Sequence, residues 1–317
     1  MYRVGIDLGG TNIATGVVDE NYQIIGRAVL KTNPEKGTEA MMNALEHSVY
    51  AAVDDAGLKL EDIKEIGIGA PGQIDCVNGI IVSACNLGAK NVLVAPILEQ
   101  RLAKKVYIKN DADAGLIGEY VAGAGKNAKA LVLLTLGTGI GSGILFHGKT
   151  YDGFNQVGVE FGHMCIDMHG EQCTCGSKGC WELYASASAL IKQTKEKMYQ
   201  HPESVMWQLC NNDLSLVDGR TAFDAMKQGD PVGKSVVMQY CEYLSVGIVN
   251  VITIFQPDVI CIGGGVSNQG DFLLEPVREL VYANETIQKQ SAKAEIRVAE
   301  LKNDAGIIGA ACLGMFQ

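Results

Sequence analysis

The stretch YRVGIDLGGTN, residues 2–12, sets the pattern on which the first half of the fold is built. An apolar run leads to Asp7, Gly9–Thr11 interrupts it, and a second apolar run extends over residues 13–19. This pattern predicts a strand, a glycine turn and a returning strand. The turn would bring bare N–H groups and a hydroxyl against a phosphate, with Asp7 placed to hold a hydrated Mg2+. The alternative is an ordinary hairpin in which Asp7 is a turn residue.

The same pattern returns between residues 130 and 147. An apolar strand from Ala130 to Leu136 leads into GTGIGSG, residues 137–143, and a further strand follows. These glycines superficially match a dinucleotide fingerprint, but that fingerprint joins a strand to a helix, whereas here the glycines join two strands. A nicotinamide fold is therefore disfavoured. Two such turns facing each other would instead clasp the two ends of a triphosphate.

A third glycine turn, GGGVS at residues 263–267, follows the apolar strand 258–262. Glycine backbone without side chains would let a flat purine or a ribose approach closely. A tight turn without a ligand is the other interpretation.

Two polar positions follow predicted strands in the first third of the chain. The strand 65–70 runs into Pro71-Gly72, and the strand 106–109 delivers Asn110 and Asp111 at the start of a helix. Ligands of α/β proteins gather at the carboxyl ends of strands, so Asp111 would project into a binding site. An aspartate at this place would also serve as a helix N-cap with no other role.

The segment GFNQVGVEFGHMCIDMHGEQCTCGSKGCWE, residues 153–182, concentrates side chains that bind metals. His163, Cys173, Cys175 and Cys180 have the ligand types and close spacing of a Cys3His zinc site, and four protein ligands make such a zinc structural. Glu160 and Glu182 flank the cluster and, with the free nitrogen of the histidine, would hydrogen-bond to hydroxyl groups. The alternative is a set of buried free cysteines beside a solvated acidic loop.

Composition narrows the class of protein. The 317 residues are 47% hydrophobic and 20% charged, with 38 glycines and a net charge of −10, which fits one large or two smaller α/β domains. No Lys/Arg run is present to bind nucleic acid, and no apolar run reaches the roughly 20 residues of a membrane span. The other cysteines are scattered singly in apolar surroundings, which is typical of a reduced, cytoplasmic protein.

Taken in order, these motifs resemble the ROK sugar kinases (repressor, open reading frame, kinase) of the actin and hexokinase superfamily, and most of all the bacterial ROK glucokinases. The motifs that carry the likeness are Asp7-Leu-Gly-Gly-Thr, Gly69-Ala-Pro-Gly, Asn110-Asp-Ala, Leu136-Gly-Thr-Gly-Ile-Gly, Glu160-Phe-Gly-His, the cysteine loop 173–182, Gly263-Gly-Gly-Val and Asn303-Asp-Ala-Gly. The resemblance implies a two-lobed α/β fold of the actin/hexokinase (ribonuclease H-like) type with a cleft. Residues 1–117 with a helix 303–317 would form the smaller lobe, and residues 118–302 the larger lobe with the zinc loop and the adenosine-binding turn.

The resemblance also implies roles for individual residues. Asp111 would be the general base toward a sugar hydroxyl, Gly72 would line the pocket, and the remaining hydroxyls would be held by Asn110, Glu160, His163 and Glu182. ATP with Mg2+ would contact Asp7, Gly9, Gly10, Thr11, Asn12, Gly137, Thr138, Gly139, Gly264 and Gly265. Zinc would be bound by His163, Cys173, Cys175 and Cys180. A homodimer or a larger homo-oligomer is the family's habit.

The expected reaction is the phosphorylation of D-glucose to glucose 6-phosphate in glycolysis. Three positions depart from the family pattern: Val159 where Gly or Ala is usual, Ala89 where Trp is frequent, and Ser142 where Gly is commoner. Val159 and Ala89 leave N-acetylmannosamine, allose or fructose open as the substrate, whereas Ser142 is a small change that the turn would tolerate. A sugar-responsive repressor is disfavoured, because the first strand begins at Tyr2 and the charge is negative. A non-catalytic sugar-binding regulator is disfavoured because Asp7, Asp111 and the glycine turns are all present.

Overall fold

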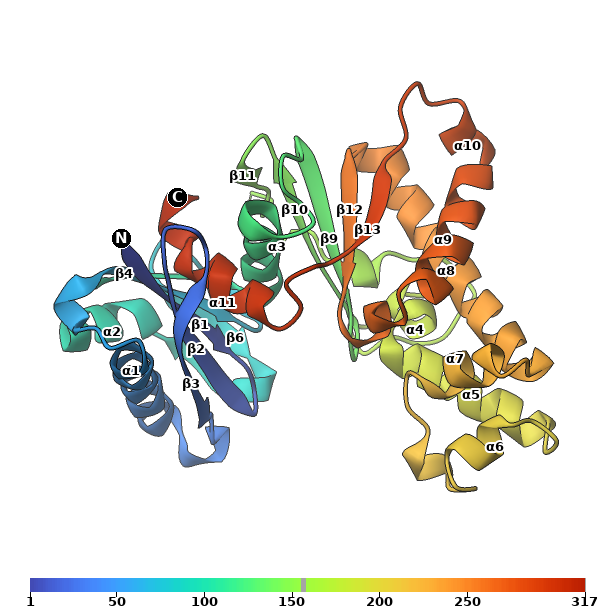
Figure 1. Ribbon diagram of the computed structural model, residues 1–317, viewed down its shortest axis with the longest axis horizontal. Helices are drawn as coiled ribbons and strands as arrows, with labels where there is room; N and C mark the ends of the chain where they lie inside the picture. The colour runs from blue at the N-terminus through green and yellow to red at the C-terminus, as the bar shows by residue number, and fades with distance from the viewer. Residues whose placement is uncertain (155–157, 317) are drawn as a thin grey trace. The chain divides into compact units, whose positions relative to one another are not determined.

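The computed structural model describes residues 1–154 and 158–316, and the chain forms two compact units (Figure 1). The first contains Met1–Leu133, Gly143–Val159 and Glu300–Gln317, and the second contains Leu134–Ser142 and Glu160–Ala299. The chain therefore leaves the first unit twice and returns to it twice. The lobe boundaries expected from the sequence, 1–117 with 303–317 and 118–302, stay a prediction.

The strands are β1 Tyr2–Leu8, β2 Asn12–Val18, β3 Ile24–Lys31, β4 Ile63–Ala70, β5 Gln73–Asp75, β6 Ile80–Ala84, β7 Ala89–Val92, β8 Lys105–Asn110, β9 Ala130–Leu136, β10 Ile140–Phe146, β11 Lys149–Thr150, β12 Val259–Gly263 and β13 Glu295–Val298. The helices are α1 Thr38–Asp55, α2 Val94–Leu102, α3 Asp111–Ala122, α4 Glu182–Ala185, α5 Ala187–Gln200, α6 Met206–Leu209, α7 Thr221–Lys227, α8 Pro231–Phe255, α9 Asp271–Ala283, α10 Glu285–Gln288 and α11 Asp304–Ala311.

The main sheet of the first unit has the order β3-β2-β1-β4-β8. The first three strands are antiparallel neighbours, whereas β1, β4 and β8 run parallel. In this register Asp7 lies opposite Gly69, and Ala70 lies opposite Asn110. The carboxyl ends of the three parallel strands therefore meet at one edge of the sheet, which is where ligands of such sheets bind.

Side-chain alternation along β1 explains how both faces of this sheet are covered. Val4, Ile6 and Leu8 are fully buried in one core with the apolar side of α1. On the other face Gly5 lies under α11, and an added Cβ would lie 1.8 Å from the carbonyl oxygen of Ile307. The sheet has no room for side chains here because the C-terminal helix packs directly on its backbone.

Helices α11 and α3 lie side by side and approach equally closely (Figure 1). An added Cβ at Gly309 would lie 1.6 Å from the carbonyl oxygen of Ala114, and one at Gly118 would lie 2.2 Å from that of Ala305. Both neighbours are backbone atoms of helices, which cannot move aside alone. Glycine at these positions is therefore required by the contact between the two helices.

The second sheet has the order β11-β10-β9-β12-β13, with β12 and β13 parallel. As predicted, the glycines of 137–139 join two strands, β9 and β10, so the arrangement of a nicotinamide-binding fold is absent from this part of the described chain.

The central helix of the second unit is α8. Asp230 caps it by accepting hydrogen bonds from the N–H groups of Val232 (2.8 Å) and Gly233 (3.4 Å), with Pro231 in the first turn. The helix has 25 residues, and an 18-residue window of it has a mean hydropathy of 1.3. These values would allow a membrane span, but 50% of that window is buried inside the fold. The same composition is found in core helices, and α8 packs against α4, α5, α7 and α9.

The contact between α11 and α3 generates a stability prediction. Gly309→Ala forces two helix backbones apart, and we expect the free energy of unfolding to fall by about 3 kcal/mol or more. Urea unfolding followed by circular dichroism measures it. Gly219→Ala is the control, since the nearest atom to its added Cβ is Val266 Cγ2 at 4.0 Å. A Gly309→Ala protein as stable as the control would show that the helices are not in this contact.

Candidate active site

Asn110 ties together the two loops at the strand ends of the first unit. Its Oδ1 accepts a hydrogen bond from Ala112 N (2.8 Å), which makes it the N-cap of α3, and its Nδ2 donates to the carbonyl oxygen of Gly72 (3.2 Å). Asp111 is the first residue of the helix, not its cap. The interpretation of Asp111 as an N-cap is therefore wrong, and its carboxylate is exposed at the end of β8.

Gly72 is fixed by both its backbone angle and its surroundings. Its φ is 91°, and an added Cβ would lie 2.2 Å from the carbonyl oxygen of Ser83 and 2.9 Å from the Cα of Ala84. A residue with a side chain would be strained and would also displace β6. The turn after β4 therefore presents only backbone beside Asn110.

Asp7 and Asp111 lie close enough for their charges to interact. Burial first, and then the charge of Asp111, raises the pKa of Asp7 to about 6. Although Asp111 is solvent-exposed, desolvation by the surrounding protein also raises its pKa, against a hydrogen bond from Ala112 N that lowers it. Two carboxylates that repel each other form a site that favours a divalent cation or a proton.

The first glycine turn is held by the strands around it. Gly9 N donates to the carbonyl oxygen of Asn12 (2.9 Å), and Thr32 Oγ1 donates to that of Gly9 (2.6 Å). Thr32 N donates to the carbonyl oxygen of Thr11 (3.0 Å), and an added Cβ at Gly10 would be in tight contact, 3.1 Å, with the carbonyl oxygen of Asn86. The turn is thus rigid, with the side chains of Thr11 and Asn12 exposed.

Two residues near the first glycine turn, Lys31 and Gly306, were not predicted from the sequence to be part of the site. Lys31 Nζ donates to Asn12 Oδ1 (2.9 Å) and brings a positive charge to the turn. It lies opposite Asn12 in the hairpin register, so counting residues along the two strands would have found it. Gly306 of α11 lies against Asp7, since an added Cβ would be 3.0 Å from the carboxylate carbon. Its motif was noted in the sequence, but no local signal links it to Asp7.

The two glycine turns of the second unit lie next to each other. Gly264 has a φ of 83° and lies against the end of β9. An added Cβ at Gly264 would lie 2.4 Å from the carbonyl oxygen of Leu136, so only glycine fits here. Gly137 N donates to the carbonyl oxygen of Gly139 (3.0 Å) in the neighbouring turn. Thr138 is exposed, and nothing lies within 4 Å of an added Cβ at Gly265. Both turns therefore present open backbone at one place.

Gly139 also approaches Glu182. An added Cβ at Gly139 would lie 2.3 Å from Glu182 Oε2, so this glycine leaves space for the carboxylate. Glu182 Oε1 lies 3.4 Å from His163 Nδ1 and accepts a hydrogen bond from Cys173 Sγ (3.4 Å). Glu160 precedes the short 3-10 helix Phe161–His163, and its carbonyl oxygen accepts from His163 N (3.0 Å). The predicted hydroxyl-binding residues of the second unit thus stand close together in sequence and structure.

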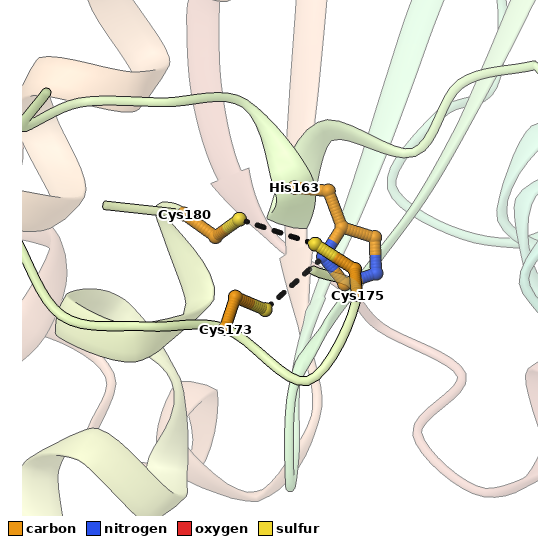
Figure 2. Close-up of side chains that lie close together, drawn as sticks. All are labelled: His163, Cys173, Cys175 and Cys180. Atoms are coloured by element: carbon orange, nitrogen blue, oxygen red, sulfur yellow. Dashed lines mark hydrogen bonds between the residues drawn. The ribbon is translucent and has the colours of Figure 1, made fainter. Parts of the chain in front are cut away.

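The thiols and the histidine form one compact cluster (Figure 2). The ligand atoms of His163, Cys173, Cys175 and Cys180 all lie within 4.8 Å of one another. His163 Nδ1 is 3.7 Å from Cys173 Sγ, and the sulfurs of Cys175 and Cys180 are 3.6 Å apart. Ligands bound tetrahedrally to zinc at about 2.3 Å lie about 3.8 Å apart, so the spacing fits such an ion. Figure 2 shows the second ring nitrogen of His163 on the side away from the sulfurs.

The surroundings of these thiols shift their pKa values in opposite directions. Hydrogen bonds, first of all from the backbone of Ser177, lower the pKa of Cys175 to about 7. Burial, and then the neighbouring cysteines, raise the pKa of Cys180 well above the ordinary value. A dication bound among these sulfurs would stabilise their thiolate forms.

Glycines and a tryptophan hold the cysteine loop. Gly176 and Gly179 have φ values of 95° and 67°, and an added Cβ at Gly179 would lie 1.7 Å from Asp167 O. Trp181 is fully buried, donates from Nε1 to the carbonyl oxygen of Tyr243 (2.9 Å) and lies directly on Gly247 of α8. The loop is therefore anchored on the central helix of its unit.

Comparisons with known proteins identify the family of this chain. A model of the ROK family matches residues 3–315. A glucokinase of Thermotoga maritima is 34% identical over 311 residues, covering 98% of this chain and 96% of the relative. The crystal structure of a ROK family glucokinase from Streptomyces griseus, solved with glucose and AMPPNP, is 33% identical, with a TM-score of 0.82 and 99% of both chains covered. A xylose repressor of Caldicellulosiruptor bescii is 30% identical and matches 98% of this chain and 77% of its own length. The predicted actin/hexokinase-type α/β fold is confirmed.

The elevated pKa of Asp7 predicts a pH-dependent stability. The carboxyl ionises near pH 3.9 in an unfolded chain and at about 6 when folded. Stability that is present below pH 4 is therefore lost as the pH rises through 6. Without magnesium, we expect Asp7→Asn to be more stable than the wild type by about 2–3 kcal/mol at pH 7 and by little at pH 4. Equal stabilities at pH 7 in thermal or urea unfolding would contradict the buried, repelled state of Asp7.

Proposed function

The chain belongs to the ROK family and is an ATP-dependent sugar kinase, and we propose that it converts D-glucose to glucose 6-phosphate with Asp111 as the general base. The observation that carries the proposal is the state of Asp111. Its carboxylate lies exposed at the carboxyl end of β8, its pKa is raised, and no lysine or arginine of residues 1–154 and 158–316 forms an ion pair with it. A carboxylate in this state is suited to take a proton.

In the proposed reaction, the sugar hydroxyl gives its proton to an Oδ atom of Asp111 as its oxygen attacks the γ-phosphorus of ATP. The bond between that phosphorus and the bridging oxygen breaks, and ADP leaves. Asn110 and Gly72 orient the reacting end of the sugar. Little covalent work is left to the protein, because phosphoryl transfer depends mainly on positioning and charge neutralisation.

The other sugar hydroxyls would be held by Glu160, His163 and Glu182. Each carboxylate accepts hydrogen bonds from hydroxyl groups, and the His163 nitrogen that faces away from the sulfurs supplies a further polar contact. Glu182 is already oriented by Cys173 and His163. Its position beside Gly139 would couple the sugar-binding residues to a nucleotide-binding turn.

ATP would be held by backbone N–H groups of the three glycine turns, at Gly9–Asn12, Gly137–Gly139 and Gly264–Gly265. Asp7 fits a hydrated Mg2+, because its carboxylate is repelled by Asp111 and lacks a cationic partner within residues 1–154 and 158–316. When bound, Mg2+ neutralises charge on the phosphate oxygens. Lys31 would add a positive charge at the first turn.

The Cys3His cluster would bind a structural zinc ion, which fixes the ring orientation of His163 and the loop that ends at Glu182. We also propose a cytoplasmic enzyme that feeds glycolysis and forms a homodimer or larger homo-oligomer. The family resemblance supports these three points, and light scattering tests the last.

Replacing the base separates binding from chemistry. We expect Asp111→Asn to bind glucose within a few-fold of the wild type by calorimetry while ADP release falls by about 10²–10⁴-fold. Asp271→Asn is a matched control, because Asp271 is likewise the exposed first residue of a helix, α9. Turnover by Asp111→Asn close to that of the control would remove Asp111 from the role of base.

The metal proposal is tested by metal content. We expect about one zinc per chain in the wild type and its loss in Cys173→Ser, because that sulfur is one of four ligands. Cys165→Ser is the control, since this exposed cysteine lies in the same loop region but outside the cluster. Zinc content that is low in the wild type, or unaffected in Cys173→Ser, would defeat the assignment.

A further inference from the structure

A buried lysine immediately precedes the two functional residues at the end of β8. Lys109 is 4% exposed, and its Nζ lies 3.4 Å from Asp113 Oδ2 of α3 and forms an ion pair with Asp152. Burying ions is costly, and an apolar group of similar size is often as stabilising. Stability alone therefore does not explain why Lys109, Asp113 and Asp152 are charged.

The triad holds more negative than positive charge. Burial, opposed by Lys109 and reinforced by Asp152, raises the pKa of Asp113 to about 6. Asp152 Oδ1 is buried and has no hydrogen-bond partner within the part of the chain that the structure describes. One lysine thus holds two carboxylates from different parts of the chain, one on the helix of Asp111 and one on the segment that follows β11.

Asp152 contacts both Lys109 and Gly158. Its carboxylate contacts Lys109, while its carbonyl oxygen accepts a hydrogen bond from Gly158 N (2.9 Å). Gly158 has no space for a side chain, because an added Cβ would lie 2.9 Å from that same carbonyl oxygen. The place at which the chain continues beyond Gly158 therefore depends on where Asp152 is held.

The residue after Gly158 is in an unusual conformation. Val159 has a φ of 69°, in the left-handed region that a β-branched residue rarely adopts. Such a conformation persists only where the surrounding structure imposes it, and it is found preferentially at functional sites. Glu160 follows directly, at the point where the chain passes into the second unit.

We propose that Lys109 and Asp152 are positioning residues for the sugar. Their partly buried ion pair holds Asp152 beside β8, and the hydrogen bond from Gly158 N to the carbonyl oxygen of Asp152 passes this constraint to the backbone that delivers Glu160. This inference rests on the proposed function, since it gives the pair its effect through Glu160.

The test compares the two carboxylates that pair with Lys109, those of Asp152 and Asp113. Asp152→Asn weakens the hold on the segment, while Lys109 keeps Asp113 as its ionic partner, so the protein is expected to fold. We expect its KM for glucose to rise about tenfold or more, with the KM for ATP unchanged, as misplacement of a binding group predicts. Asp113→Asn removes the other carboxylate without touching the segment, and we expect its KM for glucose to stay within about twofold of the wild type.

Glu99→Gln is a second control, because it removes a partly exposed ion pair with Lys105, at the end of β8 opposite to Lys109. Asp152→Glu gives the same readout should Asp152→Asn not fold. An active wild type with equal glucose KM values in Asp152→Asn and Asp113→Asn would overturn this inference alone. A wild type that phosphorylates no sugar would overturn the proposed function and this inference with it.

Discussion

The parallel pairing of β1, β4 and β8 is the constraint on which the chemistry of the first unit depends. It brings Asp7, the turn at Gly72 and Asn110-Asp111 to one edge of the sheet. Because α11 packs on the backbone of this sheet, protein atoms surround the same edge and Asp7 is desolvated. In the proposed function, the binding of a cation and a polyphosphate would offset the cost of keeping two carboxylates there. The glycines under α11 therefore serve the site as well as the fold.

In the second unit, Glu182 contacts residues of two motifs that are separate in the sequence, the cysteine loop and the glycine turn at Gly137–Gly139. It begins α4 directly after the buried Trp181, receives a hydrogen bond from Cys173 and occupies the space left by Gly139. A metal in the cysteine cluster would thus hold the loop without taking part in the reaction. This division would explain why a kinase contains a closed four-ligand site beside the residues proposed to bind a sugar.

Local patterns in the sequence predicted much of this structure. The strand–glycine–strand units and the grouping of His163 with three cysteines both follow from short-range signals. What the sequence could not indicate are contacts between distant residues. The approach of Gly306 to Asp7, of Gly139 to Glu182, and of Asp152 to Lys109 each depends on tertiary packing. The cap of α3 depends on a related detail: two neighbouring side chains compete for Ala112 N, and Asn110, not Asp111, holds the capping position.

The identity of the sugar is the point that one measurement decides most directly. The purified protein would be given MgATP with glucose, N-acetylmannosamine, N-acetylglucosamine, mannose, allose or fructose, and ADP release would be followed for each. The similarity to glucokinases predicts the highest kcat/KM with glucose, with the phosphate on the 6-hydroxyl of the product. ADP release that no sugar accelerates over the rate with MgATP alone would contradict the account.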